Sequence, residues 1–111
     1  MENKVITINK EVFDYDLKLS DIVTHNNKSY YVDTAFVFDA FTLETMVFEM
    51  KNAIVDDYDI DNESNIKKLM DLVDWKGIYT ERYLDKQEAE KNHNRIVNNI
   101  SKYGRAEGAV N

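Results

Sequence analysis

The stretch YYVDTAFVFDAFTLETMVFEM, residues 30–50, decides the fold. From Tyr30 to Phe38 successive side chains alternate between two sets, which is the period of a β-strand. Residues 43–50 alternate in the same way after a short link at 40–42. We therefore expect two antiparallel strands with one face inside, whose outward acidic residues keep the sheet from pairing edge to edge with other chains.

Upstream of this stretch the sequence predicts further strands. Residues 22–25 and 28–32 flank the pair Asn-Asn at 26–27, and asparagine tolerates the positive φ of a tight hairpin turn. The β-branched run at 4–8 indicates one more strand, and residues 12–16 indicate a second one after a polar break.

Downstream of residue 50 the period changes to that of helices. The spacing predicts an amphipathic helix over 64–74, then a short strand over 78–83. Asp85, with Glu88 three residues later, is a typical N-cap for a last helix that ends before Gly104. The apolar stripe of the first helix is expected to contain Ile66, Leu69, Met70, Leu72, Val73 and Trp75.

These elements predict an α+β fold: an antiparallel sheet of about five strands with two helices, the C-terminal helix packed on the sheet. We expect residues 1–103 to form one domain and residues 104–111 to be a flexible C-terminal tail. The helix face that packs on the sheet is expected to contain Ala89, His93, Ile96, Val97 and Ile100.

The composition excludes several classes of function. The chain has 111 residues, a formal net charge of −7 and no cysteine. Direct binding to nucleic acid or to an anionic membrane is disfavoured, because both depend on Lys and Arg. Without cysteine there is no disulfide or thiolate metal site, and no motif indicates a cofactor or metal. The default location is the cytoplasm, which is the host cytoplasm if a phage encodes the protein.

The densest charge lies in residues 56–63, DDYDIDNE. Its alternating carboxylates start like a calcium-binding loop, but Asn62 and Lys68 replace the glycine and the closing glutamate of that motif. We interpret the cluster as a surface for a basic host protein, such as a nucleic-acid-binding defence nuclease, in the manner of an anti-CRISPR protein or DNA mimic. The partner-binding residues would be Asp56, Asp57, Asp59, Asp61 and Glu63. Further acids are expected to extend this surface: Asp14, Asp16, Asp21, Asp33, Asp39, Glu44 and Glu49.

Two alternatives stay open. The first is a sponge that sequesters a small phosphate-bearing nucleotide signal at a homodimer interface, since arginine suits phosphate and tyrosine suits base stacking. Its residues would be Arg82, Arg95, Tyr79, Tyr83 and His93. The second is a small hydrolase that uses His93 with Glu81 as its partner. A lone histidine on an apolar helix face is more often a core residue bonded to a backbone carbonyl.

Three short motifs resemble a family of uncharacterised proteins encoded by phages and prophages. They are the strand Glu-Thr-Met-Val-Phe at 44–48, the strand Glu-Arg-Tyr at 81–83, and a helix with Glu88-Ala89 followed by His93 and Val97. The resemblance covers roughly residues 43–97. It implies a viral or mobile-element origin, and it implies no activity.

Overall fold

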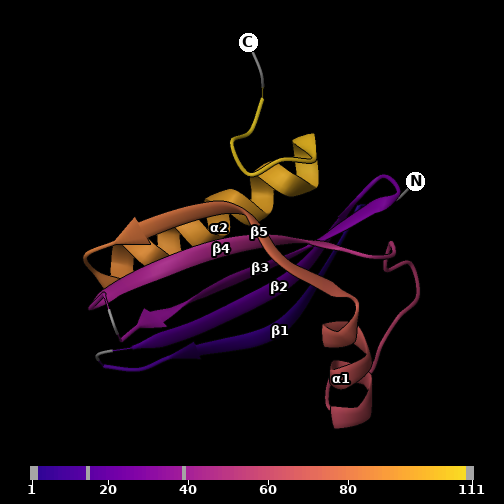
Figure 1. Cartoon of the computed structure of the whole chain (residues 1–111), viewed down its shortest axis with the longest axis horizontal. Helices are drawn as coiled ribbons and strands as arrows, with labels where there is room; N and C mark the ends of the chain where they lie inside the picture. The colour runs from indigo at the N-terminus through magenta and orange to yellow at the C-terminus, as the bar shows by residue number, and fades with distance from the viewer. Residues whose placement is uncertain (1–2, 15, 39, 110–111) are drawn as a thin grey trace.

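The computed structural model describes residues 3–14, 16–38 and 40–109. Its elements follow one another along the chain as strands β1 (Lys4–Val12), β2 (Leu17–His25), β3 (Lys28–Val37) and β4 (Thr42–Met50), helix α1 (Glu63–Asp71), strand β5 (Val73–Tyr83) and helix α2 (Lys86–Tyr103). The strands form one antiparallel sheet in the order β1-β2-β3-β4-β5 (Figure 1). The predicted α+β fold, with five strands and the last helix on the sheet, is confirmed.

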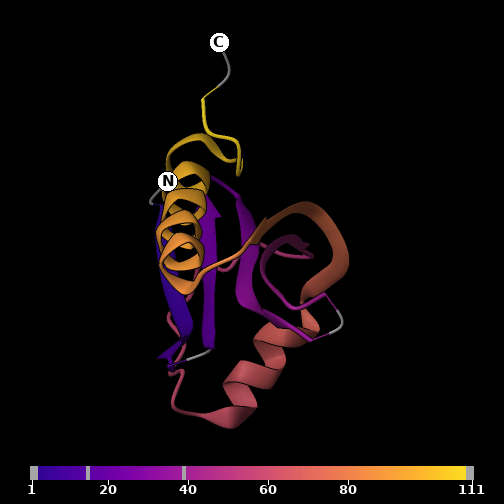
Figure 2. The ribbon, with the colours of Figure 1, turned by 90° about the vertical axis from the view of Figure 1, so that its left-hand side faces the viewer.

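The two helices cover opposite faces of the sheet (Figure 2). Helix α2 buries Ile96, Val97 and Ile100 against Val32 and Val47 on one face. On the other face the single buried residue of α1, Leu69, joins a second cluster. That cluster contains Ile22, Tyr31, Phe48, Met50, Ile54 and Val73. Both faces of the central strands are therefore buried, and the prediction of one inward and one outward face is wrong for the first half of β3.

Local signals place the ends of most elements. Asn26 takes a positive φ of 55° in the turn between β2 and β3, as the paired asparagines predicted. The Asp85 side chain accepts a hydrogen bond from the Glu88 N–H, and Gly104 ends α2 with a φ of 74°. These contacts satisfy backbone groups that the first and last turns of a helix leave without intrahelical partners.

Several element boundaries differ from the prediction. Strand β1 runs to Val12 rather than to residue 8, β2 begins at Leu17 rather than at residue 22, and β5 begins at Val73 rather than at residue 78.

Residues 13, 14 and 16 do not continue a strand, and Tyr15 lies outside the described residues. The Phe13 N–H donates to the Asp16 carbonyl at 2.7 Å and closes the turn between β1 and β2. Helix α1 stops at Asp71, because Val73 pairs with Met50 in the sheet. Trp75 consequently belongs to β5, where its ring lies 5.9 Å from that of Tyr31.

The C-terminal segment is also packed, in contrast to the predicted flexible tail. Ala106 is buried in the core cluster under α2, and its carbonyl accepts a hydrogen bond from Asn99 at 2.9 Å. Residues 104–109 therefore belong to the folded body. Residues 110 and 111 lie outside the described residues.

Tyr31 gives the folded protein a dependence on alkaline pH. Burial, assisted by the carboxylate of Asp33, raises the pKa of Tyr31 from 10 to about 12. The unfolded chain then loses this proton first, so the contribution of Tyr31 is fully present below pH 10 and falls by about 2–3 kcal/mol as the pH approaches 12. Urea unfolding of the wild type and of Tyr31→Phe across this range measures it. Equal pH dependence of the two proteins would show that Tyr31 is not the group responsible.

Candidate functional site

The five carboxylates predicted to bind a partner lie on the loop between β4 and α1 and on the first residue of α1. All five residues, Asp56, Asp57, Asp59, Asp61 and Glu63, are exposed to solvent. Within the residues that the structure describes, no group of three histidine, aspartate or glutamate side chains is arranged to hold a metal ion. Exposed carboxylates that are not arranged to hold a metal ion can still form hydrogen bonds and ion pairs with a basic protein surface.

A buried anchor holds this loop to the sheet. Ile54 is 2% exposed, its backbone N–H donates to the Ser29 hydroxyl at 2.8 Å, and its carbonyl accepts from the Thr24 hydroxyl at 3.2 Å. The two hydroxyls also bond each other at 2.6 Å, and both residues are buried. Both backbone groups of Ile54 are hydrogen-bonded to side chains of the sheet, so the chain is held in place just before the acidic residues.

The far end of the loop is fixed by the start of α1. The Asn62 side chain accepts from the Ser64 N–H at 2.9 Å and acts as N-cap. One oxygen of Asp59 accepts from the Asp61 N–H at 3.1 Å, and the Asn65 amide donates to the Asp59 carbonyl at 3.1 Å. Because hydrogen bonds hold the loop at both ends, its carboxylates project from an ordered backbone.

Lysine neutralises part of the acidic surface that the sequence predicted. Lys4 pairs with Asp57, and this hydrogen bond holds the pKa of Asp57 below its usual value. Outside the loop, three of the expected acids are also paired: Asp33 with Lys18 at 2.6 Å, Glu49 with Lys28 at 3.0 Å, and Glu44 with Arg82 at 2.7 Å.

One more of the expected acids is withdrawn from the surface. Asp21 is buried under α2, so it presents no charge to a partner, and Asp39 lies outside the described residues. Asp14 stays exposed, and the half-buried Asp16 accepts from the Leu17 N–H at 2.7 Å, so only part of the expected negative surface remains. Four carboxylates of the loop make no ion pair within the described part of the chain: Asp56, Asp59, Asp61 and Glu63.

A second group of polar residues lies beneath α2. His93 is 1% exposed, and its two ring nitrogens contact the Asp21 carboxylate at 2.6 Å and the Thr34 hydroxyl at 2.7 Å. The other oxygen of Asp21 accepts from Thr7 at 2.7 Å. The expectation that His93 is a core residue is correct, but its partners are a carboxylate and a hydroxyl rather than a backbone carbonyl.

The hydrogen-bonded chain continues across the sheet to β5. The Thr34 hydroxyl contacts that of Thr45, and the Tyr83 hydroxyl contacts that of Thr45 at 3.1 Å and donates to Glu81 at 2.9 Å. Burial raises the pKa of Tyr83 well above its usual range. We call these residues the buried polar chain: Thr7, Asp21, His93, Thr34, Thr45, Tyr83 and Glu81.

Glu81 ends the chain at the surface, where Arg95 binds both of its oxygens at 2.6 Å and Tyr79 donates to it. Burial alone would raise the pKa of Glu81, but hydrogen bonds from Arg95, Tyr79 and Tyr83 outweigh this effect and hold the pKa below its usual value. Arg95 is therefore already engaged by a carboxylate.

The five residues predicted for a phosphate ligand do not form one site. Tyr79, Tyr83 and Arg95 meet at Glu81, and His93 joins them only through the two threonines. Arg82 points to the other face of the sheet, where it pairs with Glu44. A phosphate at either arginine would have to compete with a bound carboxylate.

The geometry does not support the pair His93 and Glu81 that was predicted for a hydrolase. His93 does not contact Glu81; its acid is Asp21. Carboxylate, imidazole and hydroxyl do align in Asp21, His93 and Thr34, but Thr34 is 0% exposed under α2. A nucleophile must reach the substrate, so the Thr34 hydroxyl cannot act as one in this structure.

Sequence reasoning missed the roles of Asp21 and Thr34. Both lie on strands far from His93 in the sequence, and no local motif links them. The one available signal is that Asp21 stands in a run of residues suited to a buried strand, where an acid needs a partner. Several residues of the three phage-type motifs do meet in the buried polar chain: Thr45, Glu81, Tyr83 and His93.

Comparison with protein families, with characterised proteins and with solved structures finds no match to this chain. The resemblance to phage and prophage proteins stays a prediction. In the described residues, no helix is both long and apolar enough to cross a bilayer.

Proposed function

We propose that the protein is a non-enzymatic binding protein that places its acidic loop on a basic surface of a partner protein and blocks that surface. The observation that supports this most is the ordered loop: four exposed carboxylates without ion-pair partners in the described residues, between the Ile54 anchor and the Asn62 cap. An ordered loop loses little conformational entropy on binding, so more of the interaction energy appears as affinity.

The net charge of the protein indicates which kind of partner the acidic loop would bind. The net charge of −7 accelerates encounter with a positively charged protein and repels nucleic acid. A groove that binds DNA or RNA is basic because its Lys and Arg neutralise phosphates, so a host nucleic-acid-binding protein, such as a defence nuclease, is the class of target. A phage or prophage origin, as the motifs imply, agrees with such a role.

The nucleotide sponge has weaker support, because both of its arginines are engaged by carboxylates. A homodimer stays a prediction, and a molar mass from light scattering measures it.

Two triple variants with equal charge test the proposed surface. Asp56→Asn, Asp59→Asn and Asp61→Asn neutralise the loop while keeping side-chain shape. Glu11→Gln, Asp14→Asn and Glu88→Gln neutralise three exposed acids elsewhere. Each variant and the wild type serve as bait for affinity capture from host lysate, and each captured protein is then produced pure for binding assays.

We expect a basic protein that the wild type and the second variant retain and the loop variant loses. Capture that does not depend on the loop carboxylates, or that fails equally with both variants, would contradict the proposal. Equal failure would mean that total charge, rather than this loop, attracts the partner.

A further inference from the structure

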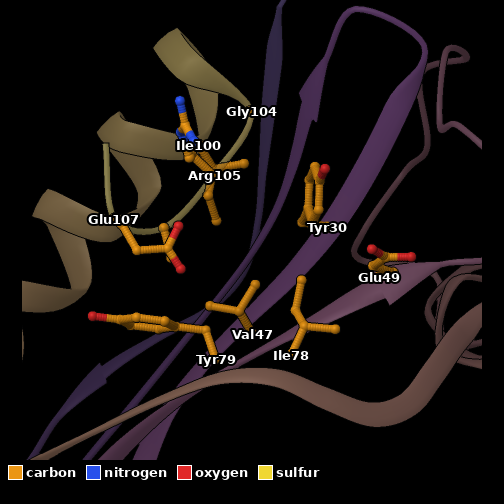
Figure 3. A pocket seen from close by; sticks show the side chains of 10 residues that line it. Tyr30, Val47, Glu49, Ile78, Tyr79, Ile100, Gly104, Arg105 and Glu107 are labelled. Atoms are coloured by element: carbon orange, nitrogen blue, oxygen red, sulfur yellow. The ribbon is translucent and has the colours of Figure 1, made fainter. Parts of the chain in front are cut away.

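A cavity of about 180 Å³ lies between the C-terminal segment, α2 and the sheet (Figure 3). Its floor is apolar, formed by Val47, Ile78, Ile100 and Ala106, and the rings of Tyr30 and Tyr79 line its sides. The hydroxyl of Tyr79 is directed to Glu81, so this residue offers the cavity its ring rather than its hydroxyl. The cavity belongs neither to the acidic loop nor to the buried polar chain.

An irregularity in β5 brings Ile78 to this cavity. Val47 pairs with Tyr79, and the next residue of β4, Phe48, pairs with Gly77, so Ile78 is the extra residue of a bulge. A Cβ at Gly77 would lie 2.8 Å from the methyl group at the end of the flexible Met46 side chain, so Met46 would have to shift to admit it. Bulges redirect side chains and are frequent beside binding sites. The half-exposed Ile78 is a consequence of this bulge.

The C-terminal segment closes the cavity from the other side. Gly104 turns the chain back at the end of α2 with a positive φ, and Ala106 inserts its methyl group into the core. The hydrogen bond from Asn99 to the Ala106 carbonyl holds this turn in place. Residues 105 and 107 then extend beside the cavity.

The charges around the cavity favour a cation. The Glu107 carboxylate points toward the space between Tyr79 and Tyr30, whereas the Arg105 side chain runs along α2 (Figure 3). Glu107 forms no ion pair with any residue that the structure describes. On the other side, the Lys28 ammonium group already lies 5.6 Å from the Tyr30 ring centre and 3.0 Å from Glu49. One ammonium group, that of Lys28, is therefore already held at this cavity by a carboxylate together with an aromatic face.

We propose that this cavity binds a small organic amine, with its apolar body on Val47, Ile78 and Ala106 and its ammonium group on Glu107. An apolar cavity of about 150 Å³ accommodates benzene. A single aromatic ring or short branched chain therefore fits, whereas a nucleotide is too large for a site of this volume.

Three probes of similar size and different charge test the proposal: 2-phenylethylamine, 2-phenylethanol and 3-phenylpropanoate. Each is titrated into the full-length protein labelled with ¹⁵N, and chemical shifts report the site. We expect the amine to shift the amides of Ile78, Ala106 and Glu107, the alcohol to bind about tenfold more weakly, and the anion not to bind.

Variants locate the interaction. Glu107→Gln should weaken amine binding about tenfold, and Ile78→Trp should abolish it by filling the cavity. Asp71→Asn removes one exposed carboxylate from α1 and should leave the affinity unchanged. Circular dichroism confirms that the variants fold.

The proposal is overturned if the three probes bind equally, if none shifts the cavity amides, or if the amine shifts only residues 56–63. The last outcome would be ion pairing with the acidic loop. None of these results affects the proposed blocking function, whose residues lie elsewhere.

Discussion

Replacing His93 with alanine lowers the free energy of unfolding by about 3–5 kcal/mol. The change leaves the Asp21 carboxylate, which is 9% exposed, without its 2.6 Å partner and removes the hydrogen bond to Thr34. A buried charge or hydroxyl without a partner is costly because water cannot replace the lost bond. Urea unfolding followed by circular dichroism measures the loss.

Asn94→Ala is the matched control for this prediction. Asn94 follows His93 on α2 but is exposed, so its replacement should change the stability by less than about 0.5 kcal/mol. The double variant Asp21→Leu with His93→Leu should lose less than the sum of the single changes, because neither polar group is then left without the other. A loss below about 1 kcal/mol in His93→Ala would show that the buried polar chain does not stabilise the fold.

Replacing Leu69 with alanine lowers the stability by about 2–5 kcal/mol and releases α1 from the sheet. Leu69 is 0% exposed and is the single buried residue of this helix. A helix of nine residues is marginal in water without tertiary packing, so losing its one anchor should also unfold it locally. Hydrogen exchange of residues 63–71, with urea unfolding, measures both effects.

Lys68→Ala is the control for Leu69→Ala, since Lys68 is exposed one position earlier on the same helix. It should leave the exchange rates of α1 unchanged. If Leu69→Ala keeps the protection of α1, then other contacts hold the helix and the acidic loop has a second support.

The sequence predicted the fold best where one or two residues decide the local conformation. The paired asparagines at 26–27 and the Asp85 and Gly104 caps act over a few residues, and all three were placed correctly. The strand expected at 12–16 and the extension of α1 to residue 74 were wrong for another reason. The apolar pattern runs through both boundaries, and only pairing with distant residues, such as Val73 with Met50, ends the elements there.

The candidate sites show the same limit. The exposure of the five acids in residues 56–63 follows from their polarity, and the sequence predicted it. Which lysine neutralises which carboxylate did not follow, since Lys4 and Asp57 lie on separate segments. The link from His93 to Asp21 and Thr34 joins three elements, so only the assembled sheet and α2 bring these side chains together.

The proposed blocking function requires that the carboxylates of the acidic loop, rather than the net charge of the protein, bind the partner. Its most direct test is the dissociation constant of the captured partner, measured against salt concentration for the wild type and both triple variants. Neutralising Asp56, Asp59 and Asp61 should raise the dissociation constant about 100-fold and flatten its salt dependence, while neutralising Glu11, Asp14 and Glu88 should change it less than about threefold. Equal effects of the two triple variants, or no effect of neutralising Asp56, Asp59 and Asp61, would contradict the proposed blocking function.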